Sequence, residues 1–169
     1  MKKTILIALS IALTLTFTTC NKGGGGGGGG TDGTRSTGGG GGKGDLQKWT
    51  AVADTTFGTS DILAIAYGGG RWVAGGQDGK MAYSTDNGVT WTAVSDSTFG
   101  TFGIGGIAYG NNRFVAVGFR GKIAYSANGA SWTAVSDSTF GNCEISAIAY
   151  GKKRFVAVGG DGKIAYADR

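Results

Sequence analysis

The sequence predicts an all-β protein built from three copies of one unit of roughly forty residues. Three short segments recur along the chain: Trp-Thr-Ala-Val, Ile-Ala-Tyr-Gly and Gly-Lys-Met/Ile-Ala-Tyr. Their copies begin at Trp49, Trp91 and Trp132, at Ile65, Ile107 and Ile148, and at Gly79, Gly121 and Gly162. The first segment therefore repeats after 42 and then 41 residues. A fixed period of this length is the signature of a repeat architecture.

Each copy contains four runs with the composition of short β-strands. In the first copy these are Ile62–Tyr67, Arg71–Gly75, Lys80–Ser84 and Trp91–Val94. Gly68–Gly70 and Asp78-Gly79 separate the first three runs, and such residues form the tight turns of antiparallel strands. The runs are apolar on both faces, as expected for sheets covered on both sides. We therefore predict three four-stranded antiparallel sheets.

The first strand of each copy is rich in small residues, which suits strands that crowd together near a central axis. Ala64 and Ala66 in the first copy correspond to Gly106 and Ala108 in the second. Together with the period, this favours propeller-like blades, as part of a partial or oligomer-completed β-propeller. The number of copies leaves a β-trefoil as the alternative, because propellers usually have at least four blades.

A different composition precedes the repeats. Residues 1–19 carry Lys2 and Lys3 followed by the apolar run Thr4–Phe17, too short to span a bilayer core of about 30 Å, so a cleaved signal peptide is expected. Residues 20–44 contain the glycine runs 23–30 and 38–42 and are expected to form a flexible linker. Residues 45–169 are the predicted three-repeat β domain.

Cys20 follows Phe17-Thr18-Thr19 directly. This arrangement resembles a bacterial lipoprotein signal, in which the cysteine is acylated and becomes the new N-terminus. The resemblance implies a membrane-anchored lipoprotein lipidated on Cys20. Asn21, where inner-membrane lipoproteins carry Asp, implies the outer membrane or the cell surface. Secretion with a free Cys20 is the alternative.

The segment Ser84–Trp91 fits the pattern Ser/Thr-x-Asp-x-Gly-x-Thr-Trp. It resembles the Asp-box of sialidase-type (BNR) propeller repeats, which implies a structural turn on the face away from the binding site. The matching residues are Ser84, Asp86, Gly88, Thr90 and Trp91. The second copy, Ser126–Trp132, is one residue shorter and has no Asp.

The composition excludes several function classes. The chain has no histidine and two cysteines, of which Cys20 is assigned to the anchor, so no metal site or cofactor is expected. The formal charge is +5 and the basic residues are scattered, so we expect no nucleic-acid partner.

The resemblance to sialidases raises the question of catalysis. The family needs an arginine triad, a tyrosine nucleophile with a glutamate partner, and an aspartate acid/base. Glu144 is the one glutamate of this chain. The three candidate arginines, Arg71, Arg113 and Arg154, occupy one repeat position, which duplication explains without a site. We predict that the protein is not an enzyme, with a fragment of a sialidase-like glycoside hydrolase as the less favoured alternative.

A binding module fits the sequence better than an enzyme. On a propeller, the loops between blades and the turns that join strands two and three form one face. The candidate ligand-binding residues there are Phe119, Arg120, Asp78 and Asp161. Phe119-Arg120 is the one copy in which large side chains replace the small and acidic pattern. The ligand is expected to be a glycan or a protein, for adhesion or as a scaffold in protein assembly.

The repeat also predicts a homo-oligomer. Trp49–Val52 has the sequence of a fourth strand, and the third copy, ending at Arg169, shows only strands one to three. We expect two chains to complete a six-bladed ring by exchanging the N-terminal strand, because unpaired sheet edges promote aggregation.

Overall fold

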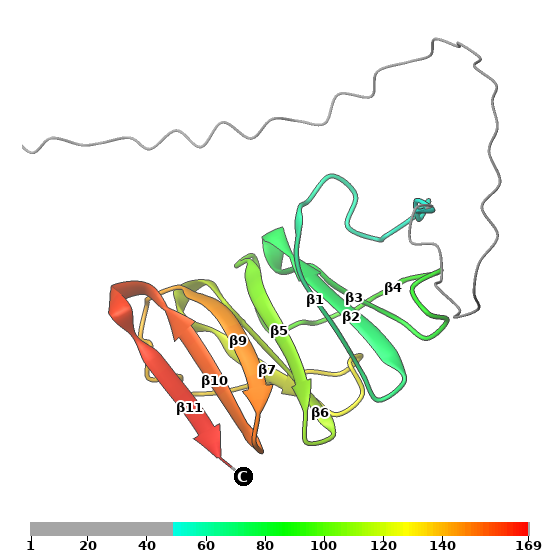
Figure 1. The fold of residues 1–169 in the computed structure, drawn as a ribbon. Coiled ribbons are helices and arrows are strands. Elements are labelled where there is room, and N and C mark those ends of the chain that lie inside the picture. Colours follow the sequence, from blue (N-terminus) through cyan, green and yellow to red (C-terminus); the bar gives the residue numbers. More distant parts are fainter. Residues whose placement is uncertain (1–48, 169) are drawn as a thin grey trace, which may run out of the picture. The chain divides into compact units, whose positions relative to one another are not determined.

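A computed structural model describes residues 49–168, which form eleven strands and three short 3₁₀ turns (Figure 1). The first group is β1 (Ile62–Gly68), β2 (Arg71–Gly76), η1 (Gln77–Gly79), β3 (Met81–Ser84) and β4 (Thr92–Ala93). The second is β5 (Ile104–Gly110), β6 (Arg113–Gly118), η2 (Phe119–Gly121), β7 (Ile123–Ser126) and β8 (Thr133–Ala134). The third is β9 (Ile145–Gly151), β10 (Arg154–Gly159), η3 (Gly160–Gly162) and β11 (Ile164–Asp168).

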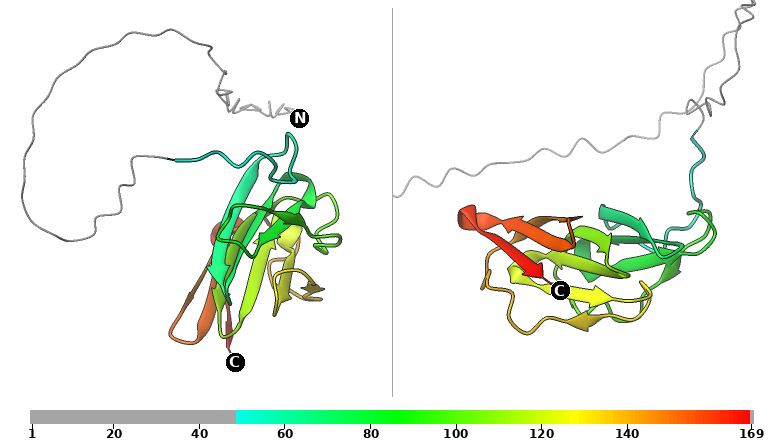
Figure 2. Two further views of the ribbon diagram at one scale, coloured as in Figure 1. Left: turned by 90° about the vertical axis from the view of Figure 1, so that its right-hand side faces the viewer. Right: turned by 60° about the horizontal axis from the view of Figure 1, so that its bottom comes forward.

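The strands form three antiparallel sheets that match the three sequence copies. The sheet orders are β1-β2-β3-β4, β5-β6-β7-β8 and β9-β10-β11, and we call them blades 1, 2 and 3. Figures 1 and 2 show the blades side by side, with β5 between β1 and β9. The most extensive contacts between blades join β1 to β5 and β5 to β9, so the blades meet mainly through the first strand of each copy.

Small residues permit the close approach of these inner strands. A Cβ atom at Gly105 would lie 3.2 Å from the Ile145 carbonyl oxygen, and one at Gly106 would lie 3.2 Å from the Ile148 nitrogen. The ring of Tyr109 lies against Gly68 of blade 1, where a Cβ would stand 2.0 Å from ring carbon. The crowding predicted from the small residues of the first strands is therefore present.

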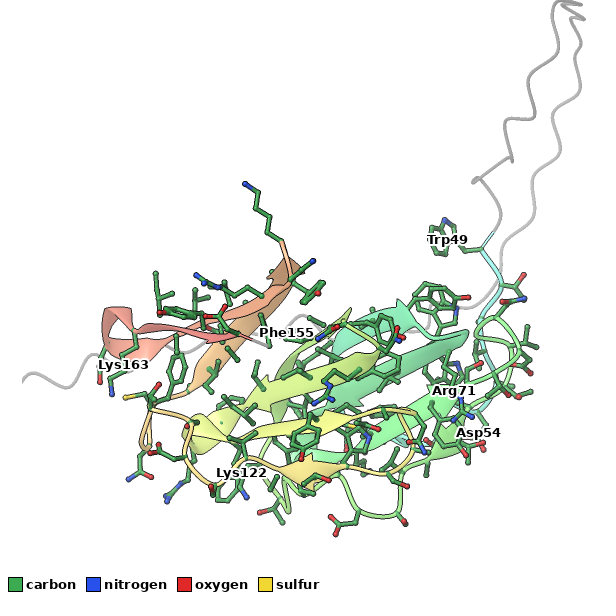
Figure 3. The ribbon with its side chains drawn as sticks, turned by 90° about the horizontal axis from the view of Figure 1, so that it is seen from below. Trp49, Asp54, Arg71, Lys122, Phe155 and Lys163 are labelled. Carbon is green, nitrogen blue, oxygen red and sulfur yellow. The ribbon has the colours of Figure 1, made fainter. Side chains whose placement is uncertain are left out.

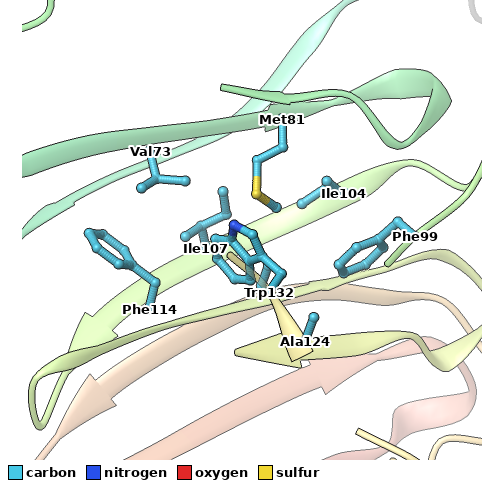
Figure 4. Close-up of a cluster of buried hydrophobic side chains, with 9 residues drawn as sticks. Val73, Met81, Phe99, Ile104, Ile107, Phe114, Ala124 and Trp132 are labelled. Atoms are coloured by element: carbon cyan, nitrogen blue, oxygen red, sulfur yellow. The ribbon is translucent and has the colours of Figure 1, made fainter. Parts of the chain in front are cut away.

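The main hydrophobic core fills the space between blades 1 and 2 (Figure 4). Val73 and Met81 come from blade 1, whereas Ile104, Phe114 and Trp132 come from blade 2. A smaller core between blades 2 and 3 includes Val117, Phe140 and Ile145, among other residues. Sheets with apolar side chains on both faces are thus stacked through those faces, as the sequence pattern indicates.

One expectation about the fourth strands needs correction. The fourth strands are shorter than predicted, because only Thr92–Ala93 and Thr133–Ala134 pair with the strand before them. Trp49–Val52, which repeats their sequence, is not a strand, and Trp49 is 88% exposed. A strand exists only by pairing, and no described residue pairs with this segment.

Residues 1–48 and Arg169 lie outside the described part, and so do Cys20, the signal peptide and the glycine-rich linker. Within the described part, no helix is long and apolar enough to cross a membrane.

Candidate functional site

The three 3₁₀ turns lie at the same end of the blades. In each blade the first amide of the turn donates to the carbonyl of the residue just before the inner strand. These pairs are Gln77 to Asp61 (2.9 Å), Phe119 to Gly103 (3.0 Å) and Gly160 to Glu144 (2.9 Å). Each turn is therefore joined to the loop that enters its own blade. The repeat brings the predicted residues Asp78, Phe119, Arg120 and Asp161 to this end, on three separate blades.

Lysine side chains hold the loops that enter the three blades. Lys80 donates to the Phe57 carbonyl at 2.8 Å, Lys122 to the Thr98 carbonyl at 3.3 Å, and Lys163 to the Phe140 carbonyl at 3.2 Å. The three lysines occupy the same position in the three copies, and the ammonium group of each donates a hydrogen bond to a loop carbonyl. They hold the scaffold of this end in place.

The middle residue of each turn has a left-handed backbone. Asp78 has φ 57°, Arg120 has φ 55° and Asp161 has φ 55°. Aspartate tolerates this region because its short side chain bonds locally, whereas arginine gains no such compensation. An arginine held in a sparsely populated conformation is the kind of strain that occurs at functional sites.

Blade 2 differs from its neighbours in the side chains it presents here. The Arg120 guanidinium carbon lies 5.3 Å from the centre of the Phe102 ring, and the Lys122 ammonium lies 5.5 Å from the same ring. Phe119 is 41% exposed and packs over Gly103, where a Cβ would lie 3.1 Å from its ring. The result is an exposed aromatic and cationic cluster.

The equivalent positions in blades 1 and 3 are polar and acidic. Ser60 donates to Asp78 at 2.9 Å, and the Cys143 thiol donates to the Asp161 carboxylate at 3.0 Å. The Asp61 carboxylate accepts a hydrogen bond from the side-chain amide of Gln77 at 2.9 Å, and the counterpart of Asp61 in blade 3 is the exposed Glu144. Cationic and aromatic groups on the middle blade thus stand between carboxylates on both sides. We call this surface the 3₁₀ face; its residues are Asp61, Asp78, Phe102, Phe119, Arg120, Glu144 and Asp161.

Sequence reasoning missed Phe102 and Lys122 as members of this cluster. Both were visible as signals: Phe102 stands where the other copies have Ser60 and Cys143, and Lys122 follows the turn directly. The stacking of Arg120 on Phe102 joins a turn and a loop that are 18 residues apart in the chain and meet only in the folded blade.

The turn Ser84–Trp91 is held together by its own side chains. Asp86 accepts hydrogen bonds from the Ser84 hydroxyl (2.8 Å), the Thr90 amide (2.9 Å) and the Thr90 hydroxyl (2.6 Å). The Trp91 indole donates to the Gly88 carbonyl at 3.0 Å, and Gly88 has φ 86°. The hydrogen bonds from Thr90 and Ser84 lower the pKa of Asp86 to about 2. Because β3 leads away from η1, this turn lies at the end of the blade opposite the 3₁₀ face.

The shorter turn in blade 2 keeps this design without an aspartate. The Asn128 side-chain oxygen accepts from the amides of Ala130 and Ser131, each at 2.9 Å. The Trp132 indole donates to the Gly129 carbonyl at 3.1 Å, as Trp91 does to Gly88. Asn128 therefore takes the place of Asp86, an equivalence that the one-residue deletion hides in the sequence.

No family model and no curated protein sequence matches the chain. Solved structures do match. Two structures of YCF48, one described as bound to D1 peptide and one from Cyanidioschyzon merolae, each superpose with a TM-score of 0.55 at 17% identity. They cover 64% of this chain, and the chain covers 38% and 34% of theirs. The WD40 β-propeller domain of Doa1 superposes with a TM-score of 0.51 at 11% identity, over 66% of this chain and 38% of the other.

The fold is that of a β-propeller. The described residues form part of one, and the chain spans little more than a third of the length of the propellers it matches. The predicted propeller-like blades are confirmed, and the β-trefoil alternative is wrong. At these identities the likeness shows the fold alone.

The repeated arginines of the propeller do not converge on one site. The guanidinium of Arg71 lies over Tyr83, that of Arg113 over Tyr125, and that of Arg154 over Tyr166, with 5.3, 5.5 and 4.3 Å to the ring centres. In each pair both residues belong to one blade. The arginines therefore stack on neighbouring strands, an arrangement that each repeat produces by itself.

Proposed function

We propose that the protein is a non-catalytic binding module that holds a segment of a protein partner on the 3₁₀ face of its propeller. The observation that carries this proposal is the replacement in blade 2 of Gln77-Asp78 by Phe119-Arg120. Aromatic residues and arginine dominate the energetics of protein interfaces, because they bury large areas and make directed hydrogen bonds.

The charges of the face favour a partner segment that carries both signs. Arg120 is exposed and offers its guanidinium to a carboxylate or a backbone carbonyl of the partner. Asp78 and Asp161 stand on the flanking blades and suit basic side chains on either side of that acceptor. Phe119, with an exposed ring face, gives an apolar residue of the partner a surface to pack on.

A protein of this fold is described in complex with a peptide, namely YCF48 bound to D1 peptide. That description concerns YCF48, but it supports a protein segment rather than a glycan as the ligand class for this chain. An assembly or scaffold role follows if the partner is itself a subunit of a larger complex.

The test uses variants that the repeat itself supplies. Phe119→Gln with Arg120→Asp copies the turn of blade 1, whose backbone angles are nearly the same, so the variant is expected to fold. The control, Asn111→Gly with Asn112→Gly, copies Gly69-Gly70 at the opposite end of blade 2. Peptides are selected against the full chain in detergent micelles from a random phage-displayed library, and a glycan array is probed in parallel.

Selected peptides are expected to bind the wild-type chain and the control alike, and to bind the Gln-Asp variant at least about 30-fold more weakly, as loss of an interface hot spot predicts. Equal binding to all three chains would show that the peptides do not bind at the 3₁₀ face. Binding of glycans without peptides would replace the protein ligand by a sugar.

We also propose that the module is displayed on a membrane by acylated Cys20, as a surface or periplasmic lipoprotein. The resemblance of residues 1–20 to a lipoprotein signal supports the anchor, and the glycine content of residues 23–44 supports a flexible tether. A tether of this kind lets the 3₁₀ face reorient toward a partner.

A further inference from the structure

Trp132 marks how one blade is attached to the next. Its side chain is 9% exposed and lies between blades 1 and 2 (Figure 4). Val73 and Met81 of blade 1 surround it on one side, and Phe99 and Ala124 of blade 2 on the other. The residues that follow it, Thr133–Ala134, form β8. A tryptophan and the short strand after it thus close the seam between two blades.

The equivalent place between blades 2 and 3 is a cavity of about 290 Å³. Its apolar wall includes the repeat positions that surround Trp132: Val115 and Ile123 of blade 2, and Phe140 and Ala165 of blade 3. Charged residues, among them Arg113, Lys153 and Asp168, also line it. The apolar walls have the composition that accommodates Trp132 one blade earlier. The cavity is therefore shaped by the repeat to take a tryptophan.

The edge strand beside this cavity has no partner among the described residues. In blades 1 and 2, Tyr83 pairs with Thr92 and Tyr125 pairs with Thr133. Tyr166 of β11, at the same position, is 64% exposed. The strand thus presents a free edge whose pairing register is already defined by the other blades.

Trp49 has the opposite character. The segment Trp49–Val52 repeats Trp132–Val135 residue for residue, yet Trp49 is 88% exposed. Phe57, eight residues further on, is buried in blade 1 and holds the segment to that blade. Figure 3 shows Trp49 and Lys163 at opposite ends of the described unit, so Trp49 does not reach blade 3 of its own chain.

The outer faces of blades 1 and 3 complement each other in the same way. Ile65 and Tyr67 of blade 1 are 56% and 52% exposed, whereas Ile107, the counterpart of Ile65 in blade 2, is 8% exposed. The ring of Tyr109 packs on Gly68 and that of Tyr150 packs on Gly110, while Gly151 has nothing within 4 Å of its Cβ position. Tyr67 therefore has no glycine of a neighbouring blade to pack on, and Gly151 has no tyrosine of a neighbouring blade packed on it, among the described residues.

Arg113 adds an independent observation beside the cavity. Its Nε atom is the buried side-chain nitrogen without a hydrogen-bond partner in the described part. The equivalent Arg71 donates through Nη1 to the Asn128 carbonyl at 2.8 Å, in the turn that precedes Trp132. Residues that precede a tryptophan seated in the cavity would stand beside Arg113 as Asn128 stands beside Arg71.

We propose that residues 49–67 of a second copy of this chain complete blade 3. Trp49 of that copy fills the cavity, Thr50 and Ala51 pair with Tyr166 and Ala165, and Tyr67 packs over Gly151. The amide of Val52 then donates to the Ile164 carbonyl, as Val94 donates to Met81 at 2.8 Å and Val135 to Ile123 at 2.8 Å. This contact lies between blades and does not depend on a ligand of the 3₁₀ face.

Disulfide crosslinking tests the register in the full chain. The pair Ala82–Ala93, equivalent to Ala165 and Ala51, lies beside the hydrogen-bonded pair Met81–Val94, so it is a non-hydrogen-bonded pair with a Cα separation of about 4.5 Å, within disulfide range. Two differently tagged full chains, each with Cys143→Ser, are co-expressed, one with Ala51→Cys and one with Ala165→Cys. The matched control replaces Ala51→Cys by Ala93→Cys, because Ala93 is already paired within its own blade.

The Ala51→Cys and Ala165→Cys pair is expected to give a crosslinked species that carries both tags and disappears on reduction, while the Ala93→Cys control gives none. Absence of the mixed crosslink would overturn the proposal. A chain that carries both substitutions and crosslinks only internally, as a monomer, would overturn it as well.

Two further variants separate association from folding. Trp49→Ala removes an exposed side chain and leaves the described unit intact, yet it should lower the mixed crosslink by about ten-fold or more, since loss of a buried tryptophan weakens association at least about 100-fold. Gly151→Ala should have a similar effect, because its new methyl group occupies the place of the Tyr67 ring. Unchanged crosslinking in both variants would show that the cavity and the open face are not the seat of the second copy.

Discussion

The Thr90 hydroxyl donates a 2.6 Å hydrogen bond to one carboxylate oxygen of Asp86, and the Thr90 amide donates a 2.9 Å bond to the other. This pair closes the turn between β3 and β4. In blade 2 a carboxamide, that of Asn128, closes the corresponding turn. A neutral acceptor can thus close the turn in blade 2, while in blade 1 the hydrogen bonds from Thr90 favour the charged form of Asp86.

Asp86→Asn is therefore expected to lower the free energy of unfolding less than Asp86→Ala, because Asn keeps an acceptor for the Thr90 amide and Ala does not. Urea denaturation followed by tryptophan fluorescence measures both. Equal destabilisation by the two variants would show that the charge, and not the acceptor, holds the turn.

Acid should weaken the fold through the same carboxylate. The pKa of Asp86 lies at about 2 in the folded protein, below its ordinary value of 3.8, so the contribution of its carboxylate to stability is complete above pH 4 and is lost as the pH falls toward 2. The free energy of unfolding, measured between pH 5 and pH 2, should therefore decrease more steeply with falling pH for the wild type than for Asp86→Asn. Parallel curves would contradict the lowered pKa.

Gly110→Ala should destabilise the protein by several kcal/mol, because its Cβ would lie 2.1 Å from the Tyr150 ring that packs between blades 2 and 3. Thermal unfolding of the wild type and of Gly110→Ala measures the loss. A melting temperature close to that of the wild type would show that the Tyr150 ring moves aside at little cost.

The protein should not hydrolyse glycosides. Arg71, Arg113 and Arg154 each stack on a tyrosine of their own blade, so they do not converge on the carboxylate of a sialoside. Fluorogenic sialosides and aryl glycosides are the substrates to test, with the full chain and with Glu144→Gln. Turnover by the wild type that Glu144→Gln abolishes would establish an enzyme instead.

Cys20→Ser removes the expected acylation site and should therefore release the protein from membranes into the aqueous phase. The effect should be large, because several acyl chains anchor a protein far more firmly than one. Detergent phase separation of cells that produce the wild type and the variant measures the partition, with Cys143→Ser as the cysteine control. A wild-type chain already found in the aqueous phase would mean secretion without a lipid.

Most of the strand pattern could be predicted because the same pattern of apolar and turn residues recurs in all three copies. The predicted Ile62–Tyr67 and Arg71–Gly75 differ by one residue from β1 and β2. The fourth strands were predicted too long, because their length depends on how far β3 and β7 run beside them. Trp49–Val52 has the sequence of a strand but not its conformation. A strand needs a neighbouring strand to pair with, and the sequence of the segment does not reveal whether one is present.

The candidate site was predicted in part. Phe119, Arg120, Asp78 and Asp161 share one end of the blades because turns at one repeat position must do so. The contact of Phe102 with Arg120 joins two elements of the tertiary structure, and no local pattern indicates it. The turn at Lys152 and Lys153 could be predicted from the repeat, since the other copies have glycines or asparagines there, although lysine by itself does not indicate a left-handed backbone.

The order of contacts along the stack, with β1 against β5 and β5 against β9, has a consequence for how the molecule opens. Blade 2 is supported on both sides, while blades 1 and 3 each rest on one neighbour. In such a one-dimensional array the outer units fray before the centre unfolds. Amide hydrogens of β5 and β6 should therefore exchange with solvent most slowly, and occupation of the outer seams by a second chain should bring the exchange of β1 and β10 close to that of the centre.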